Sequence, residues 1–250
     1  MRNISGLGAL LASILLASAC GGGGFDVTAP SPSPTAQGLW IGTTNTGRTG
    51  TALVFSDGSY YVIYSPVGNS TTIAGVVQGS GTSSSGTFFS SNARDFNLEG
   101  LGVLAATVSA SYSSKQSFNG SITYSTGGSV TFTTAYDAAY ENAASLAVLA
   151  GTYTGQVVSS AGIENATLTV STNGAISGAS SLGCSATGTA SPRTDGNAYN
   201  LSITFGAAPC IFANQTFAGI GYFNSATKRL YAAAPNAART DGVLFVGTKP

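Results

Sequence analysis

The side chains of this sequence that could carry out chemistry are few, and histidine is absent from all 250 residues. Without histidine the commonest general base and metal ligand are missing, which excludes a Ser-His-Asp triad and most zinc sites. Asp137 and Glu141, at i and i+4 of a predicted helix, could form a carboxylate pair on one helix face. Asp57, Asp195 and Asp241 each precede glycine, where aspartate most simply forms a turn. We therefore predict a protein that is not an enzyme, with no catalytic residue, cofactor or metal site.

Two short segments match catalytic or nucleotide-binding patterns in residue spacing but not in their predicted secondary structure. Residues 100–105 satisfy the glycine spacing of a dinucleotide-binding loop, but the required strand before and helix after them are not predicted. Ser225 and Lys228 have the Ser-x-x-Lys spacing of penicillin-recognising enzymes, which place both residues on one helix turn. Here they lie at a predicted hairpin tip, so we interpret both segments as loops.

The charge balance excludes nucleic acid as a partner. Charged residues make up only 7% of the chain, with nine basic and nine acidic side chains and a net charge of zero. Binding to nucleic acid requires clustered lysine and arginine that displace counterions from the phosphates. The surface is instead expected to be neutral and rich in serine, threonine and glycine.

Residues 1–19 have the features of an export signal. Arg2 precedes an apolar run from Leu7 to Leu16, and the small residues that follow end at Cys20. This charge, length and small-residue ending are typical of a signal peptide. The apolar run is shorter than the roughly 20 residues that a membrane-spanning helix needs. In an ordinary secretory signal Cys20 would be incidental, which is the alternative to the interpretation that follows.

The segment Leu16-Ala17-Ser18-Ala19-Cys20 resembles the bacterial lipobox, although Ala17 stands where leucine is commonest. The resemblance implies cleavage before Cys20 and attachment of acyl chains, such as palmitate, to that cysteine. It also implies the outer membrane as the destination, because Gly21 replaces the aspartate that retains such proteins at the inner membrane. Residues 20–37, rich in glycine, proline and serine, are then a flexible tether. The expected partner is a membrane, held through the lipid anchor.

Cys184 and Cys210 are the two remaining cysteines, and in an exported protein an even pair most simply forms a disulfide. A redox or metal pair is the alternative, but the spacing is not C-x-x-C and no histidine completes a site. Closing a loop of this size stabilises the fold by about 3 to 4 kcal/mol in the chain-entropy treatment.

The elements that must position these residues are predicted to be antiparallel strands. From Gly38 onward apolar residues alternate with polar ones, and Asp57-Gly58 and Asn173-Gly174 have the composition of tight hairpin turns. The predicted strands cover residues 51–56, 59–65, 71–78, 103–112, 117–124, 129–134, 166–171, 175–178, 199–205, 215–223, 229–233 and 243–247.

An internal repeat divides the body of the chain into two halves. Gly38-Leu39-Trp40-Ile41-Gly42 matches Gly151-Thr152-Tyr153-Thr154-Gly155, with an aromatic residue between two glycines. We predict an all-β protein with two tandem antiparallel barrels of about eight strands each, over residues 38–137 and 150–250. A short helix over 138–149 would connect them, and the disulfide would lie in the second barrel.

Gly38-Leu39-Trp40 resembles the Gly-x-Trp element of lipocalins, and Gly151-Thr152-Tyr153 with Asn173-Gly174 resembles the first hairpin of avidins. Resemblance to these calycin barrels implies closed barrels that can hold a ligand inside. Avidin-type biotin binding uses several tryptophans, whereas this chain has one, so biotin is not the expected ligand.

The sequence favours a lipid-anchored outer-membrane lipoprotein with a non-catalytic binding or surface-interaction role, whose partner would be another protein. Tyr60, Tyr61 and Tyr64 are the candidate binding surface, because alternation in a strand must turn at least one of these rings outward or toward a cavity. The alternative is a carrier of a small apolar ligand, which requires a barrel cavity of ~300 Å³ or more. An integral membrane barrel would need strands of about 9 to 11 residues, longer than most strands predicted here.

Overall fold

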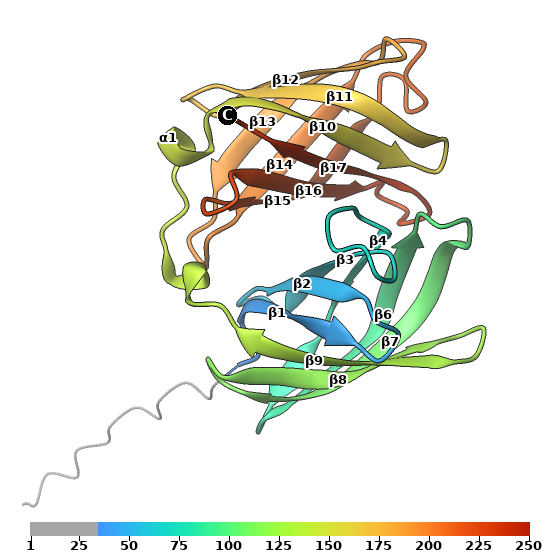
Figure 1. Ribbon diagram of the computed structural model, residues 1–250, viewed down its shortest axis with the longest axis vertical. Helices are drawn as coiled ribbons and strands as arrows, with labels where there is room; N and C mark the ends of the chain where they lie inside the picture. Colours follow the sequence, from blue (N-terminus) through green and yellow to red (C-terminus); the bar gives the residue numbers. More distant parts are fainter. Residues whose placement is uncertain (1–34) are drawn as a thin grey trace, which may run out of the picture. The chain divides into compact units, whose positions relative to one another are not determined.

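The computed structural model describes residues 35–250, and these form two closed barrels of eight antiparallel strands each, arranged in tandem along the chain (Figure 1). The predicted all-β fold class is therefore confirmed. The predicted signal peptide, Cys20 and the tether as far as residue 34 lie outside the described residues.

The first barrel is an up-and-down meander in which each strand pairs with the next, except that β4 pairs with β6 and not with the short β5. Pairing of β4 with β6 and of β1 with β9 closes the ring, while β5 pairs with β6 alone. Its strands are β1 (Gly38–Thr44), β2 (Thr49–Val54), β3 (Ser59–Tyr64), β4 (Gly75–Ser80), β5 (Thr82–Ser84), β6 (Thr87–Asn97), β7 (Gly102–Ser113), β8 (Ser117–Tyr124) and β9 (Ser129–Tyr136).

The second barrel has the same sequential order and closes through pairing of its first and last strands. Asn173-Gly174 forms the turn between its second and third strands, and Gly174 has a φ of 84°, which favours glycine. Its strands are β10 (Gly151–Ser159), β11 (Gly162–Val170), β12 (Ala175–Ser180), β13 (Ser185–Pro192), β14 (Tyr199–Phe205), β15 (Thr216–Asn224), β16 (Arg229–Pro235) and β17 (Gly242–Thr248).

A bulge in β6 determines which of its residues face the inside of the first barrel. The pairing of β6 with β7 shifts between Ser90 and Ala93, so that two residues intervene without a regular partner. A bulge of this kind changes which face the following side chains occupy. Beyond it, Asp95 pairs with Leu104, and both residues line the interior.

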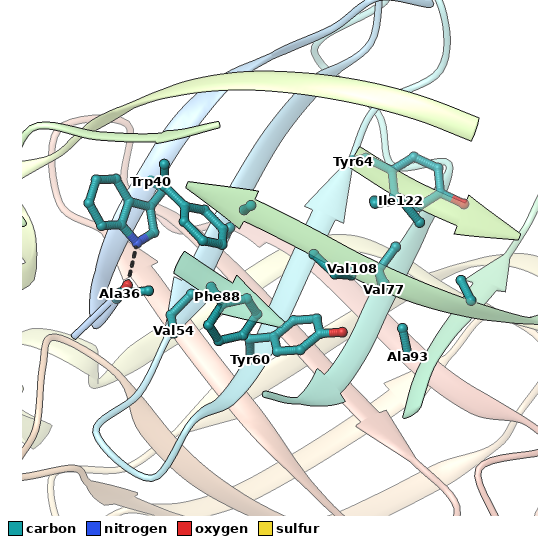
Figure 2. Close-up of a cluster of buried hydrophobic side chains, with 14 of the residues drawn as sticks. Ala36, Trp40, Val54, Tyr60, Tyr64, Val77, Phe88, Ala93, Val108 and Ile122 are labelled. Carbon is teal, nitrogen blue, oxygen red and sulfur yellow. Dashed lines mark hydrogen bonds between the residues drawn. The ribbon is translucent and has the colours of Figure 1, made fainter. Parts of the chain in front are cut away.

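Trp40 lies near the start of β1 and fills one end of the first barrel. Its side chain is fully buried, and its Nε1 donates a hydrogen bond of 2.9 Å to the carbonyl oxygen of Ala36 (Figure 2). The rings of Phe118 and Tyr136 lie 5.6 and 5.3 Å from it between centroids. Because Ala36 is itself fully buried, ordered packing begins before Gly38, where the sequence placed the end of the tether.

Tyr153 occupies the equivalent place in the second barrel. It is fully buried near the start of β10, and its hydroxyl donates to the carbonyl oxygen of Leu149, again four residues upstream. The ring of Phe223 lies 5.9 Å from it. The two aromatic residues of the sequence repeat thus share full burial near the start of a first strand and a hydrogen bond to the carbonyl oxygen four residues upstream. This likeness supports the division into related halves.

The connection between the barrels contains two short turns in place of one continuous helix over 138–149. A 3-10 helix, η1 (Ala138–Glu141), is followed by extended backbone at Asn142, and a single α-helical turn, α1 (Leu146–Leu149), comes next. Alanine-rich composition is a weak determinant of helix formation in so short a segment. The Oδ1 atom of Asp137 accepts a 2.9 Å hydrogen bond from the backbone N–H of Ala139 and so caps η1.

The predicted disulfide between Cys184 and Cys210 is confirmed, with an S–S distance of 2.01 Å. It joins the turn between β12 and β13 to the loop between β14 and β15. Cys210 is buried in a cluster that includes Phe205, Phe212 and Phe217. The disulfide therefore anchors the longest loop of the second barrel to an apolar cluster.

Candidate functional site

The interior of the first barrel contains a cavity of about 340 Å³, whereas the interior of the second leaves only about 100 Å³. Ligand pockets in proteins usually measure roughly 300 to 1,000 Å³. The first barrel is therefore hollow enough for a small molecule, and the second is filled mainly by its own side chains.

The walls of this cavity are mostly apolar because inward positions of neighbouring strands carry valine, isoleucine and aromatic residues. Figure 2 shows several of them, with Phe88 toward the end of the barrel where Trp40 lies and Tyr64 toward the other. The apolar side chains in the lining are Ala52, Val54, Val62, Val77, Phe88, Leu101, Leu104, Val108, Phe118, Ile122, Val130 and Phe132. Such a wall favours the burial of an apolar molecule by the hydrophobic effect.

Polar side chains gather at the end of the cavity opposite Trp40. Tyr64, Asn97 and Tyr124 are the last residues of β3, β6 and β8, and Arg48 directly precedes β2. All of them lie next to loops that join the strands at this end. The cavity thus has an apolar inner end and a polar outer end.

Asp95 is the most deeply buried charged group of this polar end, with 2% of its surface exposed. Its Oδ1 accepts a 2.7 Å hydrogen bond from the Tyr64 hydroxyl, and its Oδ2 accepts one of 2.8 Å from the Tyr124 hydroxyl. Burial raises the pKa of Asp95 above its usual value, although the two tyrosine hydroxyls oppose this shift. Burial and the neighbouring carboxylate also raise the pKa of both tyrosines, so each remains a hydrogen-bond donor at neutral pH.

Arg48 lies at the rim of the polar end and is already paired with Glu99. Its Nη2 is 2.7 Å from a Glu99 carboxylate oxygen, and its Nη1 donates a 3.0 Å hydrogen bond to the carbonyl oxygen of Ser65. The hydrogen bond to Glu99 is the main cause that raises the pKa of Arg48. Among residues 35–250, no ion pair includes Asp95.

The three tyrosines that the sequence singled out do not share one face. Tyr60 and Tyr64 line the cavity and are buried, whereas Tyr61 points to the outer face of β3 and is half-buried. The Tyr60 hydroxyl donates a 3.0 Å hydrogen bond to Ser90, and burial raises the pKa of Tyr60 to about 12. Their role in binding stays a prediction, with Tyr60 and Tyr64 placed inside the barrel.

Three other carboxylates occupy the turns that the sequence predicted. The Oδ1 of Asp57 accepts a 2.9 Å hydrogen bond from the backbone N–H of Ser59, and that of Asp241 accepts one of 2.7 Å from the N–H of Gly242. Burial alone would raise the pKa of Asp195, but hydrogen bonds led by Arg193, which approaches to 2.8 Å, lower it to about 2. These three side chains therefore have structural partners: Asp57 and Asp241 bind backbone N–H groups, and Asp195 binds Arg193.

Asp137 and Glu141, which the sequence placed on one helix face, do not act as a pair. Asp137 caps η1, while Glu141 forms an ion pair of 2.8 Å with Lys115. Within residues 35–250 there is no cluster of three or more acidic, cysteine or histidine side chains with the geometry of a metal site. In the same part of the chain no helix has the length and apolar character needed to cross a membrane.

Asp95 is the functional candidate that sequence reasoning missed. Unlike Asp57, Asp195 and Asp241, it precedes phenylalanine and not glycine, so a turn does not explain it. Its place within a segment containing Phe88 and Phe96 could have marked it as an acidic residue inside a strand. The bulge in β6 obscures this signal because it interrupts the alternation of apolar and polar residues.

The barrel architecture alone does not assign a function, because unrelated activities occur on the same fold. No protein-family model matches the chain, and no curated protein matches it either. The chemistry of the candidate site therefore follows from the residues that line the cavity.

Proposed function

We propose that this protein is a lipid-anchored outer-membrane lipoprotein that binds a small, mainly apolar molecule inside its first barrel. The observation that carries the proposal is the cavity of about 340 Å³, which is lined mostly by apolar side chains. The role is binding and not catalysis, and the lipid on Cys20 would hold the barrels at the membrane. Binding within the barrel is favoured over a surface contact through tyrosine, because Tyr60 and Tyr64 are buried.

The distribution of polar and apolar groups also supports a binding site. Ligand pockets are typically apolar with a small number of polar groups that orient the ligand. Here Asp95, Asn97 and the tyrosine hydroxyls supply those groups at one end only. The second barrel, whose interior is nearly filled, would then have a structural or presenting role.

Blocking the cavity is expected to abolish binding. Val130 lines the cavity, and Thr131, the next residue of β9, is exposed on the outer face. Val130→Trp should weaken binding of the apolar dye N-phenylnaphthylamine at least tenfold, because the indole would occupy the space that the dye needs. Thr131→Trp adds the same side chain to the opposite face and should bind like the unchanged protein. Fluorescence titration measures both, and equal affinities in the two variants would contradict an interior site.

Membrane attachment is expected to depend on Cys20. In cells labelled with palmitate, the Cys20→Ala variant should lose the label and leave the membrane fraction, because the acyl chains supply the anchoring energy of about 0.8 kcal/mol per buried methylene. Thr131→Ala changes an exposed residue of the first barrel and leaves every cysteine in place, so it serves as the control and should stay labelled. A Cys20→Ala protein that remains labelled in the membrane fraction would refute the lipoprotein assignment.

A further inference from the structure

We infer that the ligand of the first barrel carries a protonated amine that pairs with Asp95, on an apolar body that extends toward Trp40. This inference rests on the proposed function and specifies the chemistry of the ligand. Its starting point is a buried carboxylate that lines a cavity and forms no ion pair within the described part of the chain, with Arg48 acting on it only as a more distant charge.

A buried carboxylate is costly unless a counter-charge or several hydrogen bonds compensate for the lost hydration. Asp95 receives one hydrogen bond on each oxygen, from Tyr64 and from Tyr124. Each carboxylate oxygen can accept more than one hydrogen bond, so acceptor capacity remains. An ammonium group supplies both the missing positive charge and the missing donors.

The other charged groups at this end of the cavity disfavour an anionic ligand. Arg48 is the basic side chain in the lining, but Glu99 and the carbonyl oxygen of Ser65 already accept its hydrogen bonds. A carboxylate head group would have to displace Glu99 from Arg48 and would also meet the charge of Asp95. An amine would meet the carboxylate of Asp95 and an arginine whose charge Glu99 already balances.

The position of Asp95 also sets the orientation of the ligand. Its two partners, Tyr64 and Tyr124, end β3 and β8 next to the loops, whereas Trp40 and Phe118 lie near the starts of β1 and β8. In this up-and-down barrel these strand starts lie at the opposite end from the loops that follow β3 and β8. The amine would therefore lie near the polar rim and the apolar body beneath it, so the ligand would enter with its apolar end first.

Three probes with the same alkyl body test the head group directly: octylamine, octanol and octanoate. Calorimetric titration of the lipid-free mature chain at neutral pH should give octylamine an affinity about tenfold to a hundredfold above that of octanol, the range for a hydrogen bond to a charged group. Octanoate should bind most weakly. Octanoate binding as tightly as octylamine, or equal affinities for octylamine and octanol, would overturn the inference.

The variant Asp95→Asn keeps the shape of the side chain and removes its charge, so octylamine and octanol should then bind equally. Glu141→Gln removes an exposed carboxylate that does not line the cavity, and it should keep the preference for octylamine. A preference that survives Asp95→Asn would refute the role of this residue.

The pH dependence of octylamine and octanol binding to the unchanged protein gives a second test. This test does not depend on whether the Asp95→Asn variant folds. Of the groups near the head-group position, Arg48 and the hydroxyls of Tyr64 and Tyr124 keep their neutral-pH states in mild acid. Glu99 is paired with Arg48 and does not line the cavity. Asp95 loses its charge as the pH falls through its raised pKa, so the preference for octylamine should disappear there while octanol binding persists. A preference that persists at acidic pH in the folded protein would contradict the inference. If none of the probes binds and Val130→Trp changes nothing, the proposed function itself fails.

Discussion

Replacing Trp40 with alanine is expected to lower the free energy of unfolding by about 3 to 5 kcal/mol, the range measured for the removal of large aromatic side chains from protein cores. The side chain is fully buried and contacts the rings of Phe118 and Tyr136. Its loss also leaves the carbonyl oxygen of Ala36 without its hydrogen bond. Chemical denaturation followed by far-ultraviolet circular dichroism measures the change.

The variant Trp40→Phe separates the ring contacts from the hydrogen bond. Phenylalanine keeps an aromatic ring at this position but lacks the N–H that donates to the carbonyl oxygen of Ala36. The Trp40→Phe variant should therefore lower the free energy of unfolding by only about 1 to 3 kcal/mol. Because Trp40 packs against Phe118, which lines the cavity, the alanine variant should also accommodate longer members of the proposed amine ligands than the unchanged protein does. A loss below about 1 kcal/mol for alanine would show that this end of the barrel is held by other contacts.

Removing the disulfide is expected to lower the free energy of unfolding by about 3 to 4 kcal/mol, because the unfolded chain gains the freedom of an open loop. The double variant Cys184→Ala/Cys210→Ala suits this test, since Cys210 lies among phenylalanines and alanine introduces no polar atom there. Denaturation curves of the two proteins measure the difference.

Reduction provides the control for this prediction. Dithiothreitol should destabilise the unchanged protein by a similar amount and should leave the double variant unaffected. Cys20 should be replaced in both proteins so that neither lipid nor a third thiol intervenes. Equal stabilities of the oxidised protein and the double variant would show that the closed loop contributes nothing to the second barrel.

The parts of the fold that depend on local chemistry could be predicted from the sequence. Asp57-Gly58 and Asn173-Gly174 form turns because glycine adopts the positive φ that these turns require, 79° at Gly58 and 84° at Gly174. The disulfide followed from the pairing of two cysteines in a chain that is predicted to be exported. The aromatic residues of the repeat, Trp40 and Tyr153, marked the start of each half, although β1 and β10, which contain them, were not among the predicted strands.

Strands β6 and β13, which were also absent from the predicted strands, and the connection were harder to predict, each for its own reason. In β6 the bulge between Ser90 and Ala93 interrupts the alternation, and in β13 the inward residues are as small as Ala186 and Gly188. Neither segment has the regular pattern by which a strand is recognised. In the connection, alanine-rich composition predicts one helix, whereas extended backbone at Asn142 separates two short turns.

The candidate site could not be predicted because it depends on contacts between distant strands. Tyr64 and Tyr124 lie 31 and 29 residues from Asp95 along the chain, and only the register of the closed barrel brings the three together. Whether a barrel is hollow depends on the combined volume of all the side chains that point into it. The two halves have similar strand patterns, yet their interiors differ about threefold in volume.

The sequential strand order also has a consequence for the order of folding. The ladders that close the first barrel use residues 38–136, and those of the second use residues 151–248. A chain that folds as its N-terminal part becomes available first can therefore complete the first barrel once Tyr136 pairs with Trp40. At that point β10 need not yet be available for folding. Until β9 arrives, β1 presents an unpaired edge that is open to misassociation. The hollow barrel can thus fold first. The proposed ligand can then fill it before the second barrel has folded.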